Sequence, residues 1–213
     1  MKNKGKFIVI EGMDGSGKST IIKMFKKYLL DNNKLDKFVF TREPGSTFSK
    51  EAEKIRDLIL DNENDFSSTV DALLFATSRR INLEKGIWPE LEKGKVVISD
   101  RYWHSSFVYQ GILGKAGLKE VKKINQIATK NTKPNFVIFF DLEPQISIER
   151  LTNLRNHMDR LESMNVNYYI KLRKAYWEVI NDNPSTFRVI DASCQIDELF
   201  EKVINVLKDE KVI

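Results

Sequence analysis

Residues that cross-link a chain or ligate soft metals are scarce in this sequence. Its 213 residues include one cysteine, Cys194, and two histidines, His104 and His157. A lone cysteine excludes a disulfide within the chain. The histidines are far apart in sequence and form no cluster with the cysteine, so we do not expect a zinc site.

Long hydrophobic runs are also missing. Near the N-terminus the apolar run covers only residues 7–10 and stops at Glu11. A signal peptide needs roughly 7–15 apolar residues in a row, and a membrane span needs about 20. We therefore expect a cytoplasmic protein without a membrane partner.

A dense basic run is absent as well. The chain has 35 Lys and Arg against 30 Asp and Glu, a net charge of +5. Lysines alternate with acids, as in residues 50–57 and 84–95, which is typical of a solvated surface. We therefore expect no nucleic-acid partner, although a modest positive bias suits polyanionic nucleotide ligands.

One glycine-rich segment is informative. Residues 12–19 read G-M-D-G-S-G-K-S, which fits the pattern G-x-x-x-x-G-K-[S/T] between an apolar run and a helix-like stretch. In that context backbone N–H groups and a helix N-terminus point at one place, where an anion binds. Lys18 can reach the β and γ phosphates of a nucleotide, and the Ser19 hydroxyl can bind Mg²⁺. The predicted ATP-binding residues are Gly12, Met13, Asp14, Gly15, Ser16, Gly17, Lys18, Ser19 and Thr20.

Apolar runs and helical patterns alternate along the whole chain. The runs predict doubly buried strands at residues 7–10, 38–41, 96–99, 136–140 and 187–190. Helices are predicted at residues 19–32, 49–60, 67–93, 104–113, 118–130, 144–151, 166–181 and 195–208. This alternation is typical of a parallel sheet with helices on both faces. We predict one α/β domain over residues 1–213, with a five-stranded parallel sheet and the fold of P-loop kinases.

Charged residues follow the second and third predicted strands. Ligands of open parallel sheets bind at the carboxyl ends of the strands, where Arg42 and Arg101 stand. The planar guanidinium group donates two parallel hydrogen bonds to phosphate, although an arginine there can also form a simple salt bridge. Asp100 ends an apolar strand, the usual position for a carboxylate that holds Mg²⁺; its alternative role is a helix N-cap.

Five motifs occur in a fixed order. They are I-E-G-M-D-G-S-G-K-S-T at 10–20, T-R-E-P-G at 41–45, L-L-F-A-T-S-R at 73–79, D-R-Y followed by Y-Q-G within 100–111, and D-R-L-E at 159–162. Order and spacing resemble the thymidylate kinase family along nearly the whole chain. The resemblance implies Mg²⁺-dependent transfer of the γ-phosphoryl group of ATP to dTMP, giving dTDP for DNA synthesis, by a homodimer. Two departures are Ser46, where the family often has a second glycine, and the lack of a glycine before residues 159–160.

The resemblance also implies roles for the motif residues. Arg42 and Arg101 would hold the acceptor 5′-phosphate. Phe75 would stack on the thymine ring, and Arg79, one helical turn later, would donate a hydrogen bond to the edge of the base.

The sugar and the rest of the base would meet a second group. Ser105 and Ser106 would line the base pocket, and Tyr109 would lie under the sugar and exclude a 2′-hydroxyl. Asp14 would accept the 3′-hydroxyl and orient Arg42. The implied substrate-binding set is Asp14, Arg42, Phe75, Arg79, Arg101, Ser105, Ser106, Tyr109 and Gln110.

Residues 150–160 resemble the mobile arginine-bearing lid of bacterial members. One subclass of the family has an arginine at the position of Gly15, so here the extra positive charge must come from elsewhere. We expect Arg155 first and then Arg150 to reach the transferred phosphate. The implied catalytic set is Lys18, Arg101, Asp14, Arg155 and Arg150, and the implied metal ligands are Ser19 and Asp100.

Three other functions compete with this one. A deoxynucleoside kinase would need a carboxylate base and no arginine pair, so Arg42 together with Phe75 and Arg79 argues against it. A nucleotide-binding regulator without turnover is disfavoured by the lid arginines. A nucleic-acid-binding protein is suggested only by net charge, and its binding would depend strongly on salt.

Overall fold

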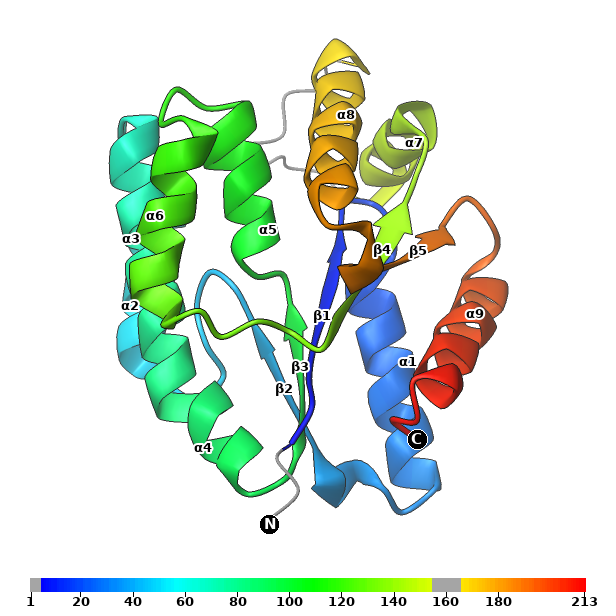
Figure 1. Ribbon diagram of the computed structural model, residues 1–213. Helices are drawn as coiled ribbons and strands as arrows, with labels where there is room; N and C mark the ends of the chain where they lie inside the picture. Colours follow the sequence, from blue (N-terminus) through cyan, green and yellow to red (C-terminus); the bar gives the residue numbers. More distant parts are fainter. Residues whose placement is uncertain (1–4, 155–165) are drawn as a thin grey trace.

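The computed structural model describes residues 5–154 and 166–213 (Figure 1). Five parallel strands form one sheet in the order β2-β3-β1-β4-β5. The strands are β1 (Phe7–Gly12), β2 (Phe38–Arg42), β3 (Val96–Asp100), β4 (Phe136–Asp141) and β5 (Phe187–Asp191). The predicted fold class and all five strands are confirmed, and each strand runs slightly past its predicted end.

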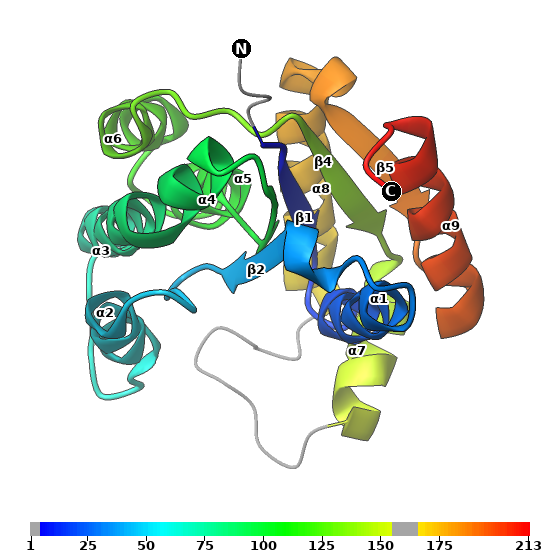
Figure 2. The same cartoon turned by 90° about the horizontal axis from the view of Figure 1, so that it is seen from below.

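Helices cover both faces of the sheet. They are α1 (Lys18–Asp31), α2 (Lys50–Leu60), α3 (Ser68–Asn82), α4 (Trp88–Glu92), α5 (Trp103–Ser106), α6 (Leu118–Thr129), α7 (Pro144–Leu154), α8 (Val166–Asp182) and α9 (Ile196–Asp209). Seen from below, α1 and α9 lie on one face and α8 on the other, while α2, α3 and α6 form an outer layer beyond β2 (Figure 2). Within the described ranges no helix is long and apolar enough to cross a membrane.

The strand register brings the expected ligand-binding segments together. Ile10 of β1 pairs with Asp100 of β3, and Asp100 also pairs with Arg42 of β2. On the other side of β1, Gly12 pairs with Phe140 of β4. The phosphate loop therefore starts at the same edge of the sheet as the segments that carry Arg42 and Arg101.

Two predictions about the elements need correction. The strands were expected to be buried on both faces; β1 is, but Val189 of β5, the strand at the edge of the sheet, is 42% exposed. The predicted helix 67–93 is continuous but changes to π geometry over Leu83–Ile87. Pro89 has no N–H to continue the α-helical ladder, and Gly86 packs against Phe48 so closely that a Cβ would overlap the ring.

A buried histidine lies where α5 meets the sheet. The His104 ring is 5.2 Å from the Phe187 ring, and its Nε2 accepts a hydrogen bond from the Trp103 indole N–H at 2.9 Å. Burial lowers the pKa of His104 from 6.5 to about 3, and the nearby charge of Arg79 adds to this effect. In the unfolded chain the ring takes up a proton below about pH 6.5, so acid favours unfolding at this residue.

We predict a pH-dependent stability difference between the protein and its His104→Gln variant. Between pH 7.5 and 5, the free energy of unfolding of the unmodified protein should fall by about 2 kcal/mol more than that of the variant. Urea unfolding at several pH values measures this. The comparison with the variant removes the contribution of Glu11 and Glu43, whose burial raises their pKa and acts in the opposite direction. Parallel pH curves for the two proteins would contradict a neutral, buried His104.

Candidate active site at the phosphate loop and the strand ends

The phosphate loop joins β1 to α1. Gly15 and Gly17 have φ angles of 77° and 92°, a left-handed region that favours glycine. A Cβ on Gly15 would lie 2.9 Å from the carbonyl oxygen of Ser147 in α7, so the loop is also closely packed from outside. This packing fixes the loop in the shape that aims its N–H groups at an anion.

Lys18 bends back over the loop. Its Nζ donates hydrogen bonds to the carbonyl oxygens of Gly12 at 2.9 Å and Met13 at 3.0 Å. Burial lowers the pKa of the Lys18 ammonium, and the charge of Arg101 lowers it further, while Asp14 opposes both. A polyphosphate at this position would supply negative charge to an ammonium that is held largely by neutral carbonyls.

A cavity of about 570 Å³ lies beside the loop. Its walls come from the loop, the start of α1, α7 and the segment that leads into α9. The lining residues are Asp14, Gly15, Gly17, Lys18, Ser19, Thr20, Arg150, Leu151, Ser193, Cys194, Gln195, Ile196 and Leu199. Most of the predicted ATP-binding residues therefore share one cavity, while Met13 and Ser16 are buried beside it.

Arg150 is held differently from our expectation. Its guanidinium donates to the carbonyl oxygens of Ala192 at 3.0 Å, Cys194 at 3.3 Å and Gly15 at 3.4 Å. These contacts fasten α7 to the phosphate loop and to the segment after β5. Instead of a cation free to meet a transferred phosphate, the structure has Arg150 in the cavity wall. Arg155 and the motif at 159–162 lie outside the described residues.

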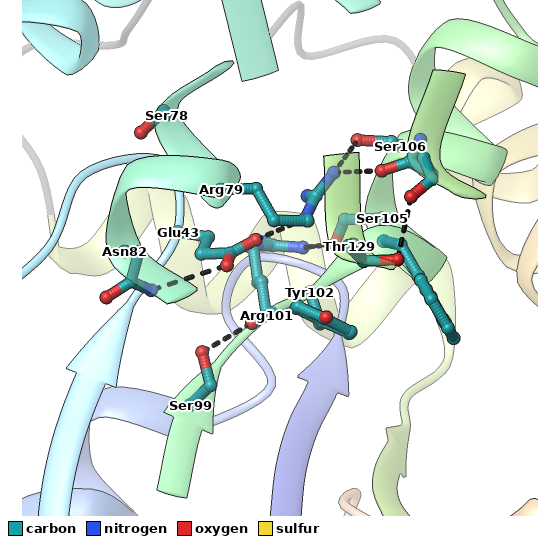
Figure 3. Close-up of polar contacts among 12 residues, drawn as sticks. Glu43, Ser78, Arg79, Asn82, Ser99, Arg101, Tyr102, Ser105, Ser106 and Thr129 are labelled. Carbon is teal, nitrogen blue, oxygen red and sulfur yellow. Dashed lines mark hydrogen bonds and ion pairs between the residues drawn. The ribbon is translucent and has the colours of Figure 1, made fainter. Parts of the chain in front are cut away.

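Arg101 is the centre of the charged cluster. Its Nη2 donates to Asp14 Oδ1 at 2.6 Å, and its Nη1 donates to the Tyr176 hydroxyl at 2.9 Å and to Ser105 Oγ at 3.1 Å. Its φ of 70° is unusual for a residue with a Cβ. The backbone is held there because the Arg101 N–H donates to the Ile10 carbonyl. Ser99 Oγ also donates to the Arg101 carbonyl (Figure 3).

The partner of Asp14 is a correction. We expected Asp14 to orient Arg42, but Arg42 pairs with Glu53 of α2 at 2.5 Å while Asp14 pairs with Arg101. The strand order explains the difference, because β1 lies directly beside β3 and β2 is one strand further away. Arg42 is 43% exposed and remains open to solvent at the same edge.

The sequence analysis did not single out Glu11, which lies beside Arg101 in the structure. This fully buried carboxylate accepts hydrogen bonds from the N–H groups of Tyr102 and Ser105 and from Ser105 Oγ at 2.7 Å. Burial raises the pKa of Glu11, and Arg101 at 3.9 Å opposes the shift. The Ser105 hydroxyl, expected in the base pocket, thus lies beneath Arg101. The available signal was an acid at the end of an apolar strand, as for Asp100.

Arg79 forms a buried ion pair with Glu43. Its Nε donates to Glu43 Oε2 at 2.6 Å, and both side chains are at most 2% exposed. Its Nη1 donates to Ser106 Oγ at 3.3 Å and to Asn125 Oδ1 (Figure 3 shows Arg79 between Glu43 and Ser106). Burial raises the pKa of Glu43, and Arg79 opposes this. Arg79 and Ser106 come together as expected; Asn125 was not anticipated.

Tyr109 and Gln110 lie in a π-helical segment after α5, Phe107–Ile112. The Tyr109 ring is 6.3 Å from the Tyr176 ring and 5.7 Å from the Arg101 guanidinium. The Tyr109 hydroxyl and Gln110 Oε1 are buried without a hydrogen-bond partner in the described structure. Such groups are costly unless a ligand or water satisfies them. Phe75, on α3, is partly buried.

The residues expected to hold Mg²⁺ fit a hard cation. Asp100 Oδ1 is buried and has no hydrogen-bond partner within the described part of the chain, and Ser19 is exposed on the cavity wall. Carboxylate and hydroxyl oxygens are the ligand type that Mg²⁺ prefers. The alternative role of Asp100 as an N-cap is not supported, because α5 begins after Tyr102.

Comparisons with known proteins agree with this geometry. The family model described as thymidylate kinase matches residues 10–203. A thymidylate kinase of Ligilactobacillus salivarius is 39% identical over 97% of this chain and 99% of its own length. One of Mycoplasma mobile is 42% identical over 93% and 96%. The crystal structure of thymidylate kinase from Ehrlichia chaffeensis superposes with a TM-score of 0.77 at 26% identity, covering 96% of this chain and 99% of that one.

We predict that Glu43→Gln is far more destabilising than removal of an exposed carboxylate on the same side of the molecule. Loss of the partner leaves the Arg79 charge buried, which costs about 3–5 kcal/mol in the free energy of unfolding. The matched control is Glu84→Gln, which breaks the exposed pair with Arg80 and should cost about 0–1 kcal/mol. Urea titration measures both values. Equal losses would mean that the Arg79–Glu43 pair is not desolvated in solution.

Proposed function

Since the chain belongs to the thymidylate kinase family, we propose that its site transfers the γ-phosphoryl group of ATP to dTMP and gives dTDP, on the way to dTTP. The observation that carries this proposal is the arrangement around Arg101. One guanidinium bonds to Asp14 of the phosphate loop and to Ser105, whose neighbour in sequence, Ser106, bonds to Arg79. It therefore joins a donor site to an acceptor site.

ATP is assigned to the cavity beside the loop. The N–H groups of residues 12–20 and the start of α1 face its phosphates, and Lys18 leaves its carbonyl partners to meet the β and γ oxygens. Arg150 holds the wall of the cavity together. Ser19 and Asp100 would hold Mg²⁺, which would offset the negative charge of the phosphates.

The monophosphate is assigned to the space between three elements: α3, α8 and the π-helical segment Phe107–Ile112. Arg42 and Arg101 hold its 5′-phosphate, Tyr109 lies at the sugar, and Phe75 and Arg79 hold the base. Ser106 and Gln110 complete this pocket. Asp14 takes the sugar 3′-hydroxyl and positions Arg101.

Transfer under this proposal depends on alignment and charge. The acceptor is a phosphate oxygen that is largely ionised near neutral pH, so no strong general base is needed. Lys18 and Arg101 hold the two reactants in line and offset the negative charge on the transferred group. We also propose that residues 1–213 act as one nucleoside monophosphate kinase domain, in which residues 150–160 form the lid and Arg155 closes on the transferred phosphate.

We further propose a homodimer that forms through the outer layer of α2, α3 and α6. Large apolar side chains are exposed on all three helices: Leu58 at 41%, Val70 at 39%, Leu73 at 50% and Ile127 at 78%. The helices lie side by side in both views (Figures 1 and 2). Exposed apolar side chains on one layer are typical of a surface that another protein covers.

The function is tested by ADP release with ATP and Mg²⁺ on dTMP, other deoxynucleoside monophosphates and thymidine. We expect turnover mainly on dTMP. Lys18→Ala and Arg101→Ala should each lower turnover by about 10²–10³-fold, because each removes a contact to the charge of the transition state. Circular dichroism checks that both variants keep their fold. Turnover on thymidine but not on dTMP would assign the chain to nucleoside phosphorylation instead.

The dimer is tested by sedimentation velocity. Ile127→Glu places a charge in the proposed interface and should convert the dimer to monomers. Leu30→Glu, which alters a similarly exposed apolar residue on α1, should leave the dimer intact. A monomeric unmodified protein at micromolar concentration would contradict the proposal.

A further inference from the structure

Asn125 of α6 belongs to none of the motifs in the sequence, yet it contacts the base-pocket arginine. It is 1% exposed, and its Oδ1 accepts a hydrogen bond from Arg79 Nη1. Its own Nδ2 donates to the Val121 carbonyl at 2.9 Å, one turn back on the same helix. This second bond fixes the amide so that an acceptor faces the guanidinium.

Three side chains therefore set the orientation of Arg79. Glu43 accepts from Nε, and Asn125 and Ser106 accept from Nη1. These contacts come from three different parts of the chain, and none of the three uses Nη2. A guanidinium has only donors, so a fixed Nη2 selects a base edge that carries an acceptor.

We propose that Asn125 is a positioning residue that sets base selectivity by holding Arg79 as a donor to a carbonyl edge. This inference rests on the proposed function. Thymine and uracil both carry an oxygen at position 4, whereas cytosine carries an amino group that would place donor against donor. An Arg79 held in this way therefore discriminates thymine and uracil from cytosine and is indifferent to the 5-methyl group of thymine.

The test compares three substrates, dTMP, dUMP and dCMP, in Asn125→Leu, which removes the acceptor at similar volume. We expect the KM for dTMP to rise about tenfold or more, because a hydrogen bond to a charged group is lost. The ratio of kcat/KM for dTMP over dCMP should fall to a similar extent, the ratio for dTMP over dUMP should stay constant, and kcat should change by less than about threefold.

Two controls separate positioning from stability. Asn125→Asp keeps an acceptor at the same place and should retain the preference for dTMP over dCMP. Thr129→Val removes another buried polar group of α6, whose hydroxyl bonds to the Asn125 carbonyl at 2.7 Å, and should lower stability without changing selectivity. If Asn125→Leu does not fold, Asn125→Ser gives the same reading, because its hydroxyl is too short to reach Arg79.

The outcomes are distinct. Unchanged KM and selectivity in a folded Asn125→Leu or Asn125→Ser protein, with an active parent, would overturn the positioning role of Asn125 alone. An equal loss of selectivity in Thr129→Val would do the same. A parent protein without turnover on dTMP would overturn the proposed function and this inference with it. Calorimetric titration of dTMP and dCMP gives the same comparison as binding constants, independent of turnover.

Discussion

The parallel pairing of β1 with β3 decides where the charges of the site lie. The register places Asp100, the last residue of β3, against Ile10, which lies two residues before the end of β1. The phosphate loop that leaves β1 and the Asp100–Arg101 segment that leaves β3 therefore meet, and Arg101 reaches Asp14 at 2.6 Å. With another strand in the place of β3, Asp14 would face different groups and would lose its contact with Arg101.

Buried carboxylates hold this arrangement in place. Glu11 accepts hydrogen bonds from the segment that follows Arg101, and Glu43 accepts from Arg79. Burial disfavours both negative charges, which raises the pKa of each carboxyl, and a neighbouring arginine opposes the shift. Such groups are expensive to desolvate and are therefore rigid once satisfied. Hydrogen-bond donors that are rigid need not move during phosphoryl transfer, so they lower the reorganisation energy of the reaction.

The T-R-E-P-G segment connects the end of β2 to α3 through polar side chains. Glu43 accepts from Asn82 Nδ2, and Asn82 Oδ1 accepts from Thr41 Oγ1 at 2.9 Å and from Ser46 Oγ at 2.7 Å. Ser46 is the residue that the sequence analysis noted as a departure from the family pattern, and its hydroxyl donates to Asn82. The loop that carries Arg42 is thus tied to the helix that carries Arg79. The residues that we propose for phosphate and base recognition therefore share one polar network.

Local sequence patterns determined the strands, the helices and the glycine-rich loop, because hydrophobic periodicity and glycine placement act over a few residues. They also placed Arg42, Asp100 and Arg101 at strand ends. Strand order, which depends on packing across the whole chain, decided the rest: it paired Asp14 with Arg101 and left Arg42 to Glu53. Tertiary packing also buried Glu11 under Arg101, turned Ser105 toward it, bound Arg150 to backbone carbonyls and brought Asn125 to Arg79. None of these contacts produces a periodic pattern in the sequence, because each joins residues that only the folded chain brings together.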